Sequence, residues 1–421
     1  MALNNVTTIL AVLIILTLSV TILPARGSIP PTTPVAVPAW SDNLGNSSNV
    51  MAACSGDCSF IAAGTWNSNI VRMYDRTGKI LWTYPAGDLY VMDVAIAGDG
   101  ETVAAGFYNA IEPNQFGGGE IVCFDRSGAI LWRYGTNATV HRIAVSDNGS
   151  RIFASGNSDV YFFDRNGTLL NRTTTGGAVW SVALSGDGTL GVAGAGYPGS
   201  GFYAMHPDGT VIMKYPTGPR IGGVAVSRDG SAFAAADYQT LDFFTGKGTF
   251  LWNFTKPAQY TGIAISSDGE YLAASSQYSV RYLNRTGDLL WTHQDPGYVW
   301  DVAVTGSGDA VFAGGNSGIF LFDRTGRALW SNNQSAGTVS AARTGEYFAA
   351  GTSSEILFFN RDGSATLPPG PVSPPGTAAV TLPAQPETPV TASSPLSGTE
   401  ILSALGCASG IFLLRKKQGP G

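Results

Sequence analysis

The chain has 421 residues, of which 54 are Gly and 44% are hydrophobic, while only 13% are charged and the net charge is −6. This composition excludes an intrinsically disordered chain, which combines high charge with low hydrophobicity, and argues against nucleic-acid binding, which needs a basic excess. Four Cys exclude a disulfide-built scaffold, and the three His share no metal-ligand spacing, so no metal site is predicted.

Residues 1–27 contain an apolar run at 6–23, followed by a proline and by the small residues Ala25 and Gly27. This order is typical of a secretory signal peptide with a cleavage site behind the apolar segment. No Lys or Arg precedes the run. An uncleaved N-terminal anchor helix is therefore the alternative.

Residues 35–364 repeat a unit of about 40 residues. Its first segment follows the pattern Val-Ala-x-Ser-x-Asp-Gly, and the turn position recurs eight times, at Cys58, Gly100, Gly149, Gly188, Gly230, Gly269, Gly308 and Gly345. A unit of this length that is rich in strand formers and glycine predicts the blades of a β-propeller. We therefore expect an all-β fold with eight blades.

Each unit divides into four predicted strands. The first is apolar on both faces, and we expect it to be an inner strand buried on both sides. The second carries small residues that let neighbouring sheets approach, and the third is aromatic. An Asp-Arg-x-Gly turn follows, and the fourth strand carries a Leu-Trp pair, with the tryptophans at Trp82, Trp132, Trp252, Trp291 and Trp330.

The recurrence of these turns and tryptophans favours a structural role over a catalytic or sugar-binding one. An Asp in such a turn bonds its own backbone, and the Gly adopts a positive φ. A buried Trp removes about 150–250 Å² from water and can hold neighbouring blades together.

The last unit lacks a fourth strand, because Gly363 is followed by a proline-rich segment. Residues 35–40, Val-Ala-Val-Pro-Ala-Trp, show the missing pattern ahead of the first unit. We expect this N-terminal strand to complete the eighth blade, which closes the ring and removes an exposed strand edge.

Two motifs carry a family resemblance. Val-Ala-x-Ser-x-Asp-Gly resembles the inner strand of WD-repeat propellers. Asp-Arg-x-Gly-x-x-Leu-Trp, as at 75–82, resembles the tryptophan-docking repeat of pyrroloquinoline-quinone-type propellers, the quinoprotein dehydrogenase-like proteins. The resemblance implies eight blades and raises the possibility of a quinone-dependent dehydrogenase. Those enzymes have a vicinal cysteine pair, whereas Cys54 and Cys58 are not adjacent, so we predict no cofactor.

In a secreted protein, Cys54 and Cys58 can form a short-loop disulfide. Cys123 lies on an aromatic third strand and is expected in the core. Beyond residue 27, Asn-x-Ser/Thr occurs at eight positions, which we predict as glycosylation sites: Asn46, Asn137, Asn148, Asn166, Asn171, Asn253, Asn284 and Asn333.

The repeat is most variable just ahead of the first strands, where polar and aromatic residues stand on a constant frame. In a propeller this position rings the mouth of the central channel, which suits a ligand or partner site. A solvated rim without ligand is the alternative. The candidate residues are Asp93, His141, Arg142, Trp180, Trp300 and Asp301. A second candidate is the insertion 109–119, either a partner-binding loop or an inert glycine-rich one.

The C-terminus has three blocks. Residues 365–395 are rich in Pro, Thr and Ser and predict an extended stalk. Residues 396–417 combine an apolar segment with the basic tip Arg415, Lys416 and Lys417, which predicts a transmembrane anchor with its C-terminus inside. This order resembles the anchors of archaeal and bacterial surface proteins. A buried C-terminal helix is the alternative.

These features predict a non-catalytic, single-pass membrane protein with an extracellular propeller that binds a surface protein, a glycan or a small ligand, or acts as a scaffold. Two alternatives are a quinone-dependent dehydrogenase and a structural component of the cell envelope. A weaker third is a hydrolase or lyase that uses His141 and Arg142.

Overall fold

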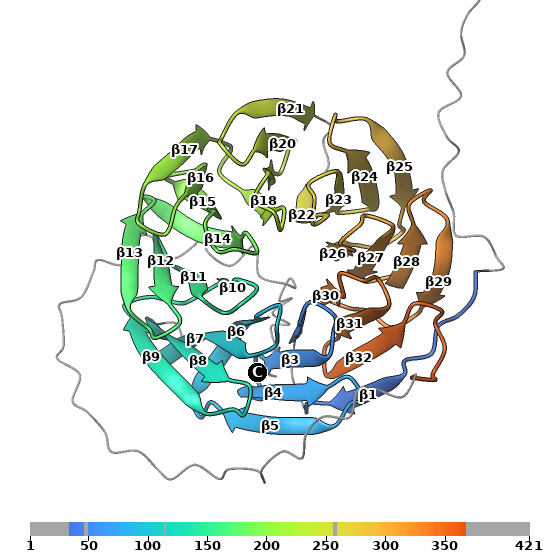
Figure 1. The fold of residues 1–421 in the computed structure, drawn as a ribbon, viewed down its shortest axis with the longest axis horizontal. Coiled ribbons are helices and arrows are strands. Elements are labelled where there is room, and N and C mark those ends of the chain that lie inside the picture. The colour runs from blue at the N-terminus through green and yellow to red at the C-terminus, as the bar shows by residue number, and fades with distance from the viewer. Residues whose placement is uncertain (1–32, 46–48, 113–114, 256–258, 368–421) are drawn as a thin grey trace, which may run out of the picture.

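The computed structural model describes residues 33–45, 49–112, 115–255 and 259–367. These residues form eight four-stranded antiparallel sheets arranged around a central axis (Figure 1). The predicted all-β, eight-bladed propeller is therefore confirmed. The N-terminal signal or anchor helix, most of the stalk and the C-terminal transmembrane helix lie outside the described residues. Within those residues, no helix has the length and apolar character needed to cross a bilayer.

Each blade runs from an inner to an outer strand in chain order, except the last. Blades 1 to 4 comprise β2 (Val50–Cys54), β3 (Phe60–Thr65), β4 (Ile70–Asp75) and β5 (Ile80–Pro85); β6 (Leu89–Ile96), β7 (Thr102–Glu112), β8 (Gln115–Asp125) and β9 (Ile130–Thr136); β10 (Ile143–Val145), β11 (Arg151–Gly156), β12 (Asp159–Asp164) and β13 (Leu169–Thr174); β14 (Gly177–Leu184), β15 (Gly191–Pro198), β16 (Gly201–Met205) and β17 (Val211–Pro216).

Blades 5 to 8 comprise β18 (Ile221–Val226), β19 (Ala232–Asp237), β20 (Thr240–Thr245) and β21 (Phe250–Thr255); β22 (Tyr260–Ile265), β23 (Tyr271–Ser276), β24 (Ser279–Asn284) and β25 (Leu289–Gln294); β26 (Val299–Val304), β27 (Ala310–Gly315), β28 (Gly318–Asp323) and β29 (Ala328–Asn332); β30 (Thr338–Ala341), β31 (Tyr347–Gly351), β32 (Glu355–Asn360) and β1 (Trp40–Asn43).

Burial is greatest in the second strands, not in the inner ones. Every residue of β19 and β27 is buried, whereas the inner strand β26 mixes buried and half-buried residues. The prediction that inner strands are buried on both faces was wrong. An inner strand has no further strand between it and the central axis, so part of it remains accessible, while a second strand has sheet on either side.

Small residues in the second strands allow the blades to pack closely, as predicted. A Cβ atom added to Gly64 would lie 2.7 Å from side-chain atoms of both Val91 and Val94 in the next blade. Likewise, a Cβ atom added to Gly314 would lie 2.8 Å from a side-chain atom of Val339 in blade 8. The inner-strand valines of one blade therefore fill the space that a side chain on the preceding blade would take.

Six tryptophans on outer strands dock on the Asp-Arg-x-Gly turn of the following blade. In each case the indole Nε1 donates a hydrogen bond of 2.8 to 3.1 Å to the backbone carbonyl of the turn Arg. Two of these turns, at 284–287 and 360–363, begin with Asn instead of Asp. The turn Gly has a positive φ and lies under the ring, as Gly128 does under Trp82. The six are Trp40, Trp82, Trp132, Trp252, Trp291 and Trp330.

Two of the eight junctions lack a tryptophan. Asn171 takes that position between blades 3 and 4, where a Cβ on the turn residue Gly209 would lie 2.5 Å from Asn171 Oδ1. Met213 and Ile212 take it between blades 4 and 5, against Gly248. These two junctions therefore lack the indole hydrogen bond that the other six share.

An N-terminal strand closes the ring, but its position differs from the prediction. The strand is β1, in which Trp40 pairs with Phe358 and Asn43 with Glu355 of β32 (Figure 1). Residues 35–39 precede it, and Val35 bridges Ser331 of blade 7 instead. Trp40 therefore begins the closing strand and does not end it, because the indole must reach Arg76 of blade 1.

The insertion at 109–119 extends the hairpin of β7 and β8. Tyr108 pairs with Gly119, and Glu112 pairs with Gln115. Both strands have 11 residues, about twice the usual length in this fold. The segment is therefore largely a β-ribbon continuous with blade 2.

Candidate functional site

The six candidate residues all lie at one end of the propeller, where the inner strands begin. Asp93 is on β6, His141 and Arg142 directly precede β10, Trp180 is on β14, and Trp300 and Asp301 are on β26. We call this the aromatic end. The opposite end carries the Asp-Gly turns that connect the first and second strands, and we call it the hairpin end.

At the aromatic end, Asp93 and Asp301 join neighbouring blades. Asp93 Oδ2 accepts a 3.0 Å hydrogen bond from the backbone N–H of Ile143 in blade 3. Asp301 Oδ2 accepts one of 3.0 Å from Val339 in blade 8, and its Oδ1 accepts one of 2.9 Å from Val302. These carboxylates therefore contribute to blade packing in addition to any ligand contact.

Arg142 is the positive charge that acts on both carboxylates. Burial raises the pKa of Asp93, and Arg142 opposes this effect. Burial also raises the pKa of Asp301 to about 6, with Arg142 lowering it and Asp93 raising it. The folded ring thus brings two acids and one guanidinium, from blades 2, 7 and 3, into one electrostatic group.

Asp301 gives a pH-dependent contribution to stability. Because its pKa rises from 3.8 to about 6, the folded chain binds this proton more tightly than the unfolded chain, and stability falls as pH rises from 4 to 6. Asp301→Asn keeps an acceptor oxygen for Val339 and removes the ionisation. We expect the free energy of unfolding of the variant, relative to wild type, to increase by about 2 kcal/mol from pH 4 to pH 7 in urea titrations.

The control for that measurement is Asp288→Asn, on an exposed turn. Hydrogen bonds from Asn284 and Thr286 lower the pKa of Asp288. Its contribution to stability is lost as pH falls, so the relative stability of this variant should change in the opposite direction. A pH-independent difference for Asp301→Asn would contradict the expectation.

The three aromatic candidates at this end belong to two ring pairs, one tilted and one stacked. The ring centroids of His141 and Trp180 are 4.7 Å apart. Burial, assisted by Arg142, lowers the pKa of His141 to about 4, so the imidazole is neutral at pH 7. The Trp300 ring lies 4.7 Å from that of Tyr298, and its Nε1 donates a 2.7 Å hydrogen bond to Asn316 Oδ1.

Further aromatic side chains at this end were not among the predicted residues. Trp66 follows β3, and its ring lies 5.7 Å from that of Tyr90 and 6.5 Å from that of Tyr108. Tyr278 is 50% exposed and packs edge-on against Tyr298. For Trp66 and Tyr278 the signal was an aromatic residue just after a second strand, a position that antiparallel pairing returns to the start of the inner strand. Tyr90 and Tyr298 stand where an inner strand begins.

At the hairpin end, the inner turns form a closed ring of backbone hydrogen bonds. In every blade, a backbone N–H just before the turn Gly or Cys donates a hydrogen bond to a backbone carbonyl of the next blade. The donor is the residue one or two positions before the turn residue, and the N···O distances are 2.8 to 3.1 Å. The series begins with Gly56 N to Gly98 O and closes with Arg343 N to Gly56 O. These bonds fix the hairpin end independently of the outer tryptophans.

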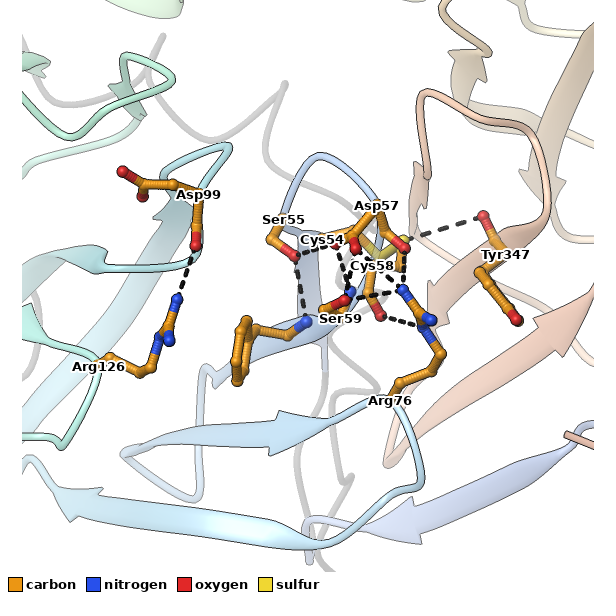
Figure 2. Close-up of polar contacts among 10 residues, drawn as sticks. Cys54, Ser55, Asp57, Cys58, Ser59, Arg76, Asp99, Arg126 and Tyr347 are labelled. Atoms are coloured by element: carbon orange, nitrogen blue, oxygen red, sulfur yellow. Dashed lines mark hydrogen bonds and ion pairs between the residues drawn. A yellow bond between two sulfur atoms is a disulfide. The ribbon is translucent and has the colours of Figure 1, made fainter. Parts of the chain in front are cut away.

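Cys54 and Cys58 are joined as a disulfide in the first turn of this end (Figure 2). Cys58 has a φ of 50°, where the other seven blades have Gly. Asp57 accepts hydrogen bonds from Ser59 and pairs with Arg76 at 3.1 Å, and the Arg76 guanidinium lies 4.5 Å from the centre of the Tyr347 ring in blade 8. Cys123 is buried and unbonded to sulfur.

The predicted glycosylation sites differ in accessibility. Five asparagines are exposed: Asn137, Asn148, Asn166, Asn253 and Asn333. Asn171 and Asn284 are half-buried; Asn171 occupies a blade junction, and Asn284 accepts three hydrogen bonds within its turn. Asn46 lies outside the described residues. Among the described residues, no three His, Cys, Asp or Glu side chains are grouped as a metal site.

Comparison with known proteins gives one family. Its model, described as "Outer membrane protein assembly factor BamB" (PQQ_2), matches residues 67–212 and 166–362, which together exceed half of the chain. The chain belongs to this family. The match bears out the predicted resemblance to pyrroloquinoline-quinone-type propellers. No curated protein sequence matches the chain significantly.

Two solved structures illustrate the shared fold of this BamB-family chain. The C-terminal WD40 domain of Sif2 has a TM-score of 0.63 at 15% identity, covering 79% of this chain and 99% of that domain. BamB from Moraxella catarrhalis has a TM-score of 0.60 at 19% identity, covering 77% of this chain and 99% of that one. At such identities the likeness concerns the fold, and it supports both predicted repeat resemblances.

Proposed function

We propose that this protein is a non-catalytic propeller that docks a partner protein on its aromatic end. The observation that carries the proposal is the concentration of partly exposed Trp, Tyr and His side chains from different blades at this one end. Aromatic side chains supply most of the binding energy in protein interfaces because they bury a large rigid area. Membership of a family described as an assembly factor supports a protein, more than a glycan, as the partner.

The carboxylates at this end support a binding role over a catalytic one. Asp93 and Asp301 each accept a backbone hydrogen bond from the following blade, which holds them in place. His141 is neutral at pH 7, and its ring packs at a tilt against Trp180. These contacts position the residues as a rigid platform around which a partner can pack.

We further propose that the propeller is displayed outside the cell on its C-terminal stalk and anchor. The Cys54–Cys58 disulfide supports this location, since such bonds persist in oxidising compartments. The five exposed sequons are consistent with a secreted chain. Protease treatment of intact cells tests the proposal: loss of the propeller from the cells supports it, and full protection would refute it.

The partner site is tested with the double variant Trp180→Ala/Trp300→Ala. We leave Asp301 unchanged because its removal would also disturb the contact with blade 8. The matched control is Leu131→Ala/Leu290→Ala, two apolar side chains that are 42% and 43% exposed on outer strands.

Pull-down from envelope extract, followed by titration of the recovered protein in purified form, provides the measurement. We expect the aromatic variant to bind at least tenfold more weakly and the control to bind like wild type, with circular dichroism showing both folded. Equal binding by both variants would overturn the proposed docking site.

A further inference from the structure

At the hairpin end, the residue two positions before each turn Gly or Cys faces the axis of the ring. Four blades have Gly at this position and one has Ser, whereas blades 3, 5 and 8 have charged residues, Asp147, Arg228 and Arg343. A pocket of about 200 Å³ is lined by these three side chains together with inner-strand residues such as Val145 and Val304. This pocket is distinct from the aromatic end.

The three charged side chains meet across the axis. Arg343 Nη2 lies 3.2 Å from Asp147 Oδ1, and Arg228 Nη2 pairs with Asp147 Oδ2. Two guanidinium groups thus share one carboxylate, which leaves one positive charge in excess within the group. Burial and the neighbouring Arg343 lower the pKa of Arg228 to about 9, in line with two cations held close together.

Glycines of the intervening blades make the arrangement possible. A Cβ on Gly98 would lie 2.8 Å from Arg228 Nη2, and one on Gly186 would lie 2.7 Å from Arg228 Cγ. The space that side chains would fill in blades 2 and 4 is therefore left for the guanidinium groups. Arg343 similarly passes over Gly56 of blade 1.

We propose that this pocket binds a small ligand through a carboxylate group held between Arg228 and Arg343. A guanidinium offers parallel N–H donors that match a carboxylate, and one such anion neutralises the excess charge. Arg228 Nη2 is buried and already paired with Asp147. A guanidinium carries five N–H donors, so the remaining N–H groups of Arg228 are the ones that can face a ligand carboxylate.

A monoanion suits the pocket better than a phosphate dianion. The turns around it carry Asp57 and Asp99, whose charges act on Arg343. Asp57 is paired with Arg76, whereas Asp99 Oδ1 accepts a turn hydrogen bond from the backbone N–H of Glu101. These acids make a second negative charge on the ligand unfavourable.

Calorimetric titration of the full chain with acetate and with inorganic phosphate, at constant ionic strength, tests the proposal. We expect millimolar acetate binding and weaker phosphate binding. Arg343→Gln should weaken acetate binding at least tenfold, and Arg343→Lys should recover only part of it. Asp147→Asn should strengthen it, since the excess positive charge rises. Arg165→Gln, on an exposed outer turn, is the control.

Three outcomes would overturn the inference. The first is the absence of acetate binding by wild type and by a folded Asp147→Asn variant, which would leave the three residues with a structural role only. The second is binding that Arg343→Gln and Arg165→Gln leave equally unchanged. The third is preferential phosphate binding, which would refute the carboxylate class. None of these results depends on the partner proposed for the aromatic end.

Discussion

A variant that lacks residues 1–44 is expected to lose the cooperative, monomeric propeller, whereas a variant that lacks only residues 1–32 is expected to keep it. The longer deletion removes β1 and leaves the edge of β32 without its partner strand. It also removes Trp40, whose Nε1 donates a 2.8 Å hydrogen bond to the Arg76 carbonyl. Unpaired strand edges promote self-association.

The closing strand also contributes a polar link from blade 8 to blade 1. Asp42 Oδ2 pairs with Arg72 at 2.6 Å and accepts a 2.7 Å hydrogen bond from the Tyr74 hydroxyl. Burial and this carboxylate raise the pKa of Tyr74, which keeps the hydroxyl protonated as a donor. Without β1, the Tyr74 hydroxyl loses its acceptor, which adds to the cost of opening the ring.

Light scattering after gel filtration and a thermal unfolding curve would measure both properties of the deletion variants. We expect oligomers and a broad, lowered transition for the longer deletion, and a monomer with an unchanged midpoint for the shorter one. A monomeric longer-deletion variant with the wild-type midpoint would show that β1 does not close the ring.

Trp330→Ala is expected to lower the free energy of unfolding by about 3–5 kcal/mol, the range for truncating a fully buried large aromatic side chain. Trp330 is 1% exposed and packs against Phe359, Phe312 and Phe348. Its Nε1 also satisfies the Arg361 carbonyl at 2.9 Å. The substitution therefore leaves both a cavity and an unpaired acceptor at the junction of blades 7 and 8.

Trp132→Ala is the matched comparison, because it removes the same type of docking contact at a more accessible junction. Trp132 is half-buried, and the centroid of its ring lies 5.1 Å from that of Phe163. We expect Trp132→Ala to lower the free energy of unfolding by about half as much as Trp330→Ala, since the substitution removes less buried apolar surface. Urea titrations with equal slopes would give both values. A larger loss for Trp132→Ala would contradict the burial argument.

Much of the fold could be predicted from local sequence because each blade repeats nearly the same sequence pattern. The turn Gly, the second-strand small residues and the docking Trp recur at fixed offsets, and each has one physical reason. The closing strand was placed about five residues too early, because both 35–40 and Trp40–Asn43 can form an edge strand. Only the distance from Trp40 to Arg76 in the closed ring fixes its position.

The candidate site was predicted in part for a similar reason. A constant offset ahead of the inner strand placed Asp93, Arg142 and Asp301 at one end, and the folded ring brings their charges together. Tyr90 and Tyr298 were missed because they stand ahead of that offset, where an inner strand begins. Trp66 and Tyr278 were missed because they follow second strands, outside that offset. Their position follows only from the antiparallel register.

The sequence by itself determined the number of blades and the internal order of each, since these depend on hydrophobic alternation, turn chemistry and docking contacts within one or two units. The tertiary structure alone decided which blades share a site. Asp147 and Arg343 are 196 residues apart, yet their side chains meet because ring closure brings the turns of non-adjacent blades to one axis. Local sequence patterns cannot predict such a contact, because the two residues belong to units that are not neighbours in the chain.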